Sequence, residues 1–130
     1  MMEQIVWKDK YKVGNVSIDN EHEVFVLIIQ KIIETYREGK GKEGLQRSIN
    51  ELYKYAEFHF CSEENVMFFA NFPNFETHRK EHQKLLIELR QIMLTVDNSE
   101  IKTKELISFL MKWFVQHTLS LDKDLAKFLN

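Results

Sequence analysis

The sequence predicts an all-α protein: an antiparallel up-down-up-down four-helix bundle with an extended N-terminal arm. Three observations predict this fold. The chain has 130 residues but only four glycines and one proline, so few residues interrupt helices. Apolar residues recur at three- and four-residue spacing in four long segments. The turns between these segments are short, which makes consecutive helices antiparallel neighbours.

The arm and the first helix come first along the chain. The arm covers about residues 1–17, which lack helical periodicity. The first helix is expected over about 19–38, and Ser17 or Asp19 can cap it because both side chains accept hydrogen bonds from free N–H groups. Its expected inner stripe is Val24, Leu27, Ile28 and Ile32. The helix is expected to stop at Gly39-Lys40-Gly41, where helical dihedral angles are easily lost.

The other three helices are bounded by a proline and a polar turn. The second, over about 43–70, ends before Pro73, which lacks an N–H and disfavours helix in the preceding residue. The third is expected over about 75–95 and the fourth over about 100–129, with Asp97-Asn98-Ser99 as the turn between them. A chain of this length is expected to form one domain over residues 1–130.

Charge and composition exclude several classes of protein. The net charge is −2 with no basic stripe, so nucleic acid is not an expected partner. The longest apolar run, Val24 to Ile29, is far short of the roughly 20 residues that cross a bilayer. The N-terminus lacks the apolar core of a signal peptide. Cys61 is the only cysteine, which excludes an intrachain disulfide and fits a reducing cytosol. We therefore expect a cytoplasmic, monomeric protein that does not associate with a membrane.

The five histidines of the chain are predicted to lie in one layer of the bundle. In an antiparallel bundle, the start of the first helix shares one end with the end of the second, the start of the third and the end of the fourth. At about 1.5 Å per residue, His22 lies about 5 Å from that end, His59 about 16 Å, His78 and His82 roughly 5–10 Å, and His117 about 18 Å. All five therefore fall in the same half of the molecule.

Two carboxylates accompany these histidines. Glu63 follows His59 by four residues, so both project from one helix face. Asp122 follows His117 by five residues, an offset of about 140° on an ideal α-helix. That spacing requires either an approach from opposite flanks of a wide site or a local π-type bulge.

The donor set indicates the kind of metal site. Five imidazoles and two carboxylates are too many ligands for one tetrahedral zinc. They suit a pair of six-coordinate metals with bridging carboxylates, and nitrogen and oxygen ligation without thiolate is compatible with iron. Metal cations would also neutralise buried carboxylates, which are otherwise costly.

Four short motifs carry a resemblance to a known family. They are "IDNEH" at 18–22, "HFCSEE" at 59–64, "HRKEH" at 78–82 and "HTLSLD" at 117–122. In order and spacing the chain resembles the hemerythrin family, and its single-domain bacterial members in particular. Trp7 before the first helix and Phe72-Pro73 before the third also look like the family. The resemblance covers nearly the whole chain.

The resemblance implies a non-haem di-iron centre with an oxo or hydroxo bridge. One iron would be bound by His78, His82 and His117, the other by His22 and His59, and both by Glu63 and Asp122. The iron with two histidines would keep an open position for dioxygen. The implied function is reversible binding of dioxygen as a carrier, store or supplier, and not catalysis.

Reversible oxygen binding needs a small dry pocket, and position suggests its lining. The candidates are Phe25, Phe60, Trp113 and Leu119, each next to a proposed ligand; an ordinary core role is the alternative for each. Thr118 departs from the family pattern, in which an aliphatic residue usually follows the histidine of the fourth helix. Its hydroxyl could bond its own helix backbone or bring polarity near the pocket.

A sensor and an enzyme are alternatives to an oxygen-binding protein. A di-iron sensor of oxygen or nitric oxide is one alternative and would need a separate partner protein. An enzyme that processes peroxide or nitric oxide is another. Ferritin-like enzymes carry Glu-x-x-His motifs on two helices, whereas no glutamate lies three residues before any histidine here.

"HRKEH" also matches the His-x-x-Glu-His pattern of some zinc proteases. A hydrolase would leave His22, His59 and His117 unexplained, and Glu81 points about 100° away from His82 on a helix. A purely structural bundle without metal is the last alternative. Glu64 and Glu81 are interpreted as solvated, Asp19 as a helix cap, and Cys61 as an incidental helix residue.

Overall fold

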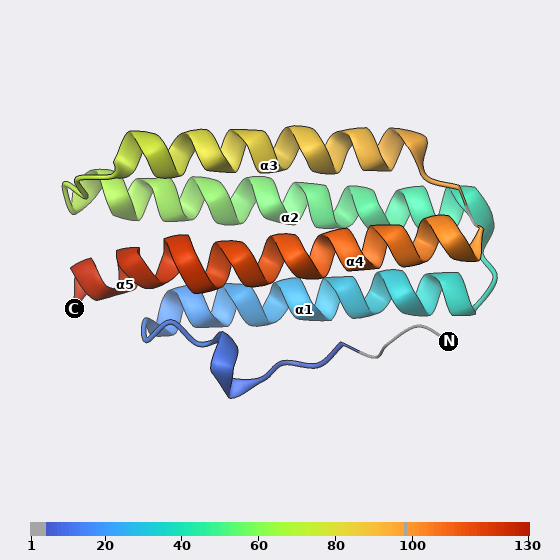
Figure 1. Cartoon of the computed structure of the whole chain (residues 1–130), viewed down its shortest axis with the longest axis horizontal. Coiled ribbons are helices and arrows are strands. Elements are labelled where there is room, and N and C mark those ends of the chain that lie inside the picture. The colour runs from blue at the N-terminus through green and yellow to red at the C-terminus, as the bar shows by residue number, and fades with distance from the viewer. Residues whose placement is uncertain (1–4, 98) are drawn as a thin grey trace.

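The molecule is a bundle of four long helices that run alternately up and down, as Figure 1 shows. The computed structural model describes residues 5–97 and 99–130, except the side chains of Thr118 and Leu119. The elements in chain order are η1 (Asp9–Tyr11), α1 (Val16–Arg37), α2 (Gly41–Phe69), α3 (Phe75–Thr95), α4 (Glu100–Gln116), the π-helical turn η2 (His117–Asp122) and α5 (Lys123–Leu129). The predicted all-α antiparallel bundle is confirmed. No helix among the described residues is long and apolar enough to cross a membrane.

Helix α1 begins at Val16, three residues before the expected start at 19. Its cap is Asn15, whose side-chain oxygen accepts the N–H of Ile18 at 3.0 Å. Ser17 lies inside the first turn of the helix. The prediction that Ser17 or Asp19 caps α1 is therefore wrong, because Asn15 is the residue with extended backbone next to the first free N–H groups.

The N-terminal arm is held against the bundle by polar and aromatic contacts. The carboxylate of Asp19 accepts the backbone N–H groups of Val13 at 2.7 Å and Gly14 at 3.3 Å. Tyr11 is buried, and its ring meets that of Phe114 edge-on with the centroids 5.4 Å apart. Between residue 5 and Asn15 the described part of the arm has no regular secondary structure apart from the 3₁₀ turn η1, and Asp19 binds its last turn before α1.

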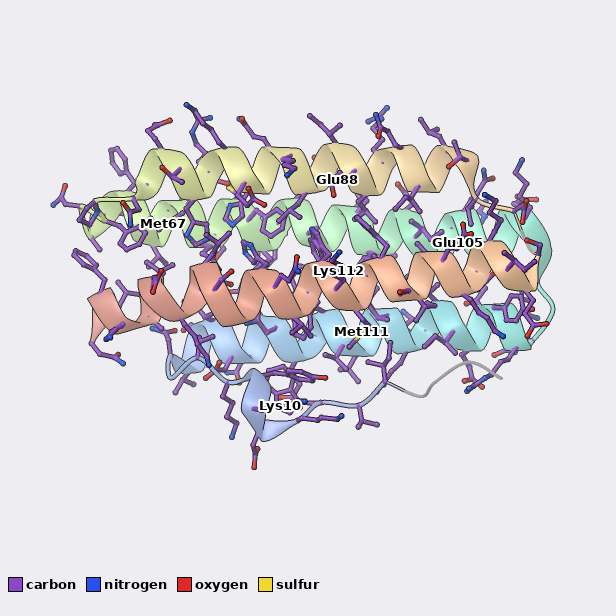
Figure 2. The ribbon with its side chains drawn as sticks, viewed as in Figure 1. Lys10, Met67, Glu88, Glu105, Met111 and Lys112 are labelled. Atoms are coloured by element: carbon purple, nitrogen blue, oxygen red, sulfur yellow. The ribbon has the colours of Figure 1, made fainter. Side chains whose placement is uncertain are left out.

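After both α1 and α2, one residue takes a positive φ angle and ends the helix. After Arg37, Gly39 takes a φ of +69°, a conformation that glycine adopts without steric cost. After α2, Asn71 takes a φ of +56°, and the N–H of Phe72 returns to the carbonyl of Met67 at 2.9 Å. Figure 2 labels Met67 at this end of the bundle. The first turn brings the end of α1 beside the start of α2, and the second brings the end of α2 beside the start of α3.

Two apolar clusters fill the interior, a large one along the bundle and a small one at the end that holds both the start of α1 and the end of α2. The small cluster consists of Ile18, Met67, Phe72 and Leu125. The expected inner stripe of α1 was wrong at two positions, because Val24 is 37% and Leu27 52% exposed. The buried face of α1 instead includes His22, Phe25 and Ile29, which lie three to four residues apart.

Candidate metal centre

Seven ionisable side chains meet in one buried layer between the helices. None is more than 6% exposed. They are His22 from α1, His59 and Glu63 from α2, His78 and His82 from α3, and His117 and Asp122 from η2. The structure thus brings all seven candidate ligands together, between the large apolar cluster and the small one.

The seven residues form two overlapping groups, within each of which the ligand atoms lie within 4.8 Å of one another. The first group is Glu63, His78, His82, His117 and Asp122, and the second is His22, His59, Glu63 and Asp122. Three histidines thus belong to one group and two to the other. Both carboxylates belong to both groups, so each can span two neighbouring cations.

Glu63 divides its two oxygens between the groups. Its Oε1 lies 2.7 Å from His78 Nε2 and 3.1 Å from His82 Nε2. Its Oε2 lies 3.2 Å from Nε2 of His59 on the same helix. One carboxylate oxygen therefore faces the three-histidine group and the other faces the two-histidine group.

Asp122 is divided in the same way. Its Oδ1 lies 3.1 Å from Nε2 of both His78 and His117, whereas its Oδ2 lies 2.7 Å from His22 Nε2. The π-helical turn makes this possible, because its hydrogen bonds span five residues and bring residues five apart onto one side. Of the two arrangements that the sequence left open for this pair, the structure contains the π-type one.

Many of the inward-facing atoms have close neighbours but no aligned hydrogen bond among the described residues. These atoms are Nε2 of His22, His59, His78 and His117, Oε2 of Glu63, and both oxygens of Asp122. Each buried polar atom without a partner costs about 1–3 kcal/mol. Cations placed between the nitrogens and oxygens would satisfy them together, so the residues fit a metal site. Imidazole and carboxylate ligands without thiolate suit iron.

Without bound cations, protons on the histidines offset the negative charge of the two carboxylates. Burial alone would lower the pKa of His59, but its contacts with Glu21 and Glu63 outweigh burial and raise that pKa to about 9. Burial would also lower the pKa of His117, which the charges of Asp122 and Glu63 raise instead to about 10. A metal that binds here must therefore displace protons from these rings.

The two carboxyl groups shift in the opposite direction. Burial alone would raise the pKa of Glu63 and of Asp122, because it disfavours a charged carboxylate. The surrounding imidazoles outweigh burial and hold the pKa of each carboxyl well below its ordinary value. Both groups are therefore charged at neutral pH and ready to bind cations.

Two further acids orient the histidines from outside. His59 Nδ1 donates to Glu21 at 2.8 Å, and His82 Nδ1 donates to Glu64 at 2.8 Å. The interpretation of Glu64 as solvated is therefore wrong, because only 25% of its side chain is exposed. Both acids are adjacent in sequence to candidate ligands, but each serves a histidine of another helix, and this pairing has no signal in the sequence. Glu81 is half-buried and belongs to neither metal-binding group among the described residues.

Aromatic side chains form the apolar wall of the layer. Phe60 stacks on His82 with ring centroids 4.0 Å apart and an interplanar angle of 7°. Phe25 meets His59 edge-on at 5.1 Å. Phe114 meets His22 edge-on at 5.8 Å. The two histidines of the smaller group are thus covered by aromatic rings.

Trp113 completes this wall. It is 5% exposed, and its ring lies 5.4 Å from that of Phe25. Phe25, Phe60 and Trp113 therefore lie beside the candidate centre, and their role as pocket residues stays a prediction. The side chain of Leu119, the fourth pocket candidate, lies outside the described part of the structure, as does that of Thr118.

Comparisons with known proteins agree with this geometry. The family model for the Hemerythrin HHE cation binding domain matches residues 13–129. A bacteriohemerythrin of Clostridium acetobutylicum is 29% identical over 124 residues, which cover 92% of this chain and 96% of that protein. A myohemerythrin of Sipunculus nudus is 26% identical over 117 residues, covering 90% and 87% of the two chains. A crystal structure of wild-type hemerythrin superposes with a TM-score of 0.83 at 21% identity and covers 98% of each chain, which shows the shared fold.

Proposed function

The chain belongs to the hemerythrin family, and on that premise we propose that it holds two iron ions and binds dioxygen reversibly. The observation that carries the proposal is the pair of overlapping ligand groups that share Glu63 and Asp122. Each of these carboxylates directs one oxygen to each group, as a bridge between two cations requires.

The two proposed ions have unequal sets of protein ligands. The first would be held by His78, His82, His117 and the two carboxylates, and the second by His22, His59 and the same carboxylates. The second ion thus has one protein ligand fewer. Iron(II) bound by these residues would supply the electrons with which dioxygen can be held and released.

The chain contributes an apolar cover over the side with fewer ligands. Phe25 lies against His59 and Phe114 against His22, so two aromatic rings shield the two-histidine group. On the side where they lie, these rings exclude water, and they carry no ionisable group that could deliver a proton. Such surroundings favour binding and release of dioxygen over its chemical conversion, and we propose that the protein is not an enzyme.

Transport, storage and sensing share this binding step, and the proposal concerns the step itself. A supplier of oxygen would release it to an acceptor, whereas a sensor would pass the signal to a partner protein. The monomeric state, the single domain and the cytoplasmic location remain predictions from the sequence.

Metal analysis and a visible spectrum of the full chain test the proposal. Iron-loaded protein should contain about two iron ions per chain, one for each ligand group. Its visible absorption should change on exposure to air and return under argon through repeated cycles. A single zinc ion per chain, no bound metal, or irreversible bleaching in air would overturn the proposal. His78→Ala should abolish the spectral change, whereas the matched variant Glu81→Gln should retain it.

A further inference from the structure

A polar cavity of about 240 Å³ lies between the start of α1 and the second half of α2. Six polar residues line it: Asn15, Ser17, Glu21, His59, Ser62 and Glu63. Ser17 is exposed at its outer side, whereas His59 is 1% and Glu63 2% exposed. Because exposed and buried residues line the same cavity, it connects the molecular surface with the candidate metal centre.

The two most buried polar residues that line this cavity, His59 and Glu63, carry atoms that lack partners. His59 Nε2 and Glu63 Oε2 lie 3.2 Å apart, and neither has a hydrogen-bond partner within the described residues. Both atoms belong to the proposed ligand set. A cation that reached this point would meet one nitrogen and one oxygen donor at once.

Glu21 stands between these atoms and the surface. Its side chain is 25% exposed, and its two oxygens accept hydrogen bonds from His59 Nδ1 at 2.8 Å and from Ser62 at 3.4 Å. The carboxylate is thus reachable from solvent and is one imidazole ring away from the proposed ligand atom of His59.

We propose that this cavity is the route by which divalent metal cations enter the centre, with Glu21 as the first carboxylate that a hydrated cation meets. The inference rests on the proposed metal centre. A divalent cation cannot shed its water in apolar surroundings, so it needs a succession of oxygen and nitrogen donors along its path. The wall of this cavity provides them from the exposed Ser17 inward to Glu63. The carboxylates also attract cations and repel anions.

A larger cavity touches the centre from the side of α3 and α4 and offers different chemistry. Its volume is about 490 Å³, and its lining includes the apolar side chains of Leu85, Trp113, Val115 and Leu121 beside His117. Glu81 also lines it, so the two openings have to be compared directly. Because four of its eight lining residues are apolar, against two of the eight that line the smaller cavity, we expect cations to use the smaller polar cavity instead.

Matched charge changes at the two openings test the route. The variants are Ser17→Glu and Ser17→Lys at the polar cavity, and Gln116→Glu and Gln116→Lys at the larger one; both residues are exposed. The full chain is stripped of metal with a chelator and mixed with Co²⁺, and uptake is followed by stopped-flow visible absorption. Ser17→Glu should raise the second-order uptake rate roughly three- to tenfold and Ser17→Lys should lower it similarly, with both effects shrinking at high salt. The Gln116 pair should change the rate less than about twofold.

The final amount of bound Co²⁺ distinguishes a failure of the proposed metal centre from a failure of the proposed entry route. If wild-type protein binds no Co²⁺, the proposed centre fails and the route fails with it. If Co²⁺ binds but the Gln116 pair alters uptake as much as the Ser17 pair, or neither pair alters it, the route is overturned and the centre stands. Val66, which is 39% exposed and lines the same polar cavity, provides a second pair, Val66→Glu and Val66→Lys, should a Ser17 variant disturb the first turn of α1.

Discussion

Glu21 and Glu64 act on the proposed ligands from behind, each through a hydrogen bond to the outer nitrogen of an imidazole. The bond keeps a proton on Nδ1, so Nε2 is the nitrogen through which His59 and His82 can bind a cation. A carboxylate partner also makes the ring a stronger donor to a cation. One acid serves the two-histidine group and the other serves the three-histidine group, so both proposed metal sites are supported from outside.

Replacing Glu64 with glutamine should weaken metal binding about 10- to 100-fold. The amide has nearly the same shape but no charge, so it polarises the ring of His82 less. The measurement is a competition titration of the metal-free protein with Fe²⁺ against a chelator of known affinity. Glu81→Gln is the matched control, because Glu81 precedes His82 in the chain but belongs to neither ligand group. Equal weakening by both substitutions would show that Glu64 has no special role.

At the scale of elements, the π-helical turn decides whether the last helix can complete the centre. Asp122 and His117 are five residues apart, and in a regular α-helix they would point to different sides. The turn accommodates one extra residue, after which α5 continues with Leu125 and Ala126 fully buried. The turn thus redirects one carboxylate without changing the packing of the helix that follows it.

Deleting Ser120 tests whether the turn is a one-residue insertion. The deletion leaves His117 and Asp122 four residues apart, a spacing that an α-helix places on one face. The variant should therefore fold, bind metal, and melt within about 5 °C of the parent protein, since a local change of about 1 kcal/mol shifts the melting temperature by that order.

Deleting Lys112, which Figure 2 labels on α4, is the control. This deletion rotates His117 and everything after it by about 100°, because no bulge absorbs the lost residue. It should abolish metal binding and strongly lower the melting temperature. Thermal melts by circular dichroism and metal content per chain provide the comparison. If the two deletions have the same effect, the π-helical turn is not caused by one extra residue between His117 and Asp122.

At the scale of the whole molecule, the buried charges couple stability to pH. The carboxylates of Glu63 and Asp122 are enclosed by apolar clusters on both sides along the bundle. In the metal-free protein, protons on the histidines neutralise them. The pKa values of His59, about 9, and His117, about 10, lie above the ordinary 6.5. Their contribution to stability is therefore complete below about pH 6.5 and is lost as the pH rises through 9 and 10.

The metal-free protein should consequently lose stability in alkali. Between pH 7 and pH 10 its melting temperature should fall by roughly 5–10 °C, because buried carboxylates lose their proton-bearing partners. The carboxyl groups, whose pKa values are lowered, contribute stability that is lost in acid instead. Differential scanning calorimetry from acid pH to pH 10 measures both effects. The metal-loaded protein should change less between pH 7 and pH 10, since cations have replaced the protons; a metal-free melting temperature that is constant up to pH 10 would contradict the assignment.

The sequence by itself determined the helical bundle and the seven candidate ligands. Both depend on local rules: apolar spacing defines each helix, and His59 with Glu63, or His78 with His82, share a face because they are four residues apart. It also anticipated the π-type turn as one of two solutions for His117 and Asp122. Antiparallel connections then place the histidine layer at one height, so no knowledge of side-chain contacts was needed.

Only the tertiary structure decided the contacts between helices. Glu21 is next to His22 in the chain but binds His59, and Glu64 binds His82 of another helix. The inner face of α1 and the direction of Asp19 also differ from the prediction. The physical reason is the same in each case: the rotation and height of a helix against its neighbours, and the N–H groups that a neighbouring segment leaves free, are set by packing across the bundle and not by local spacing.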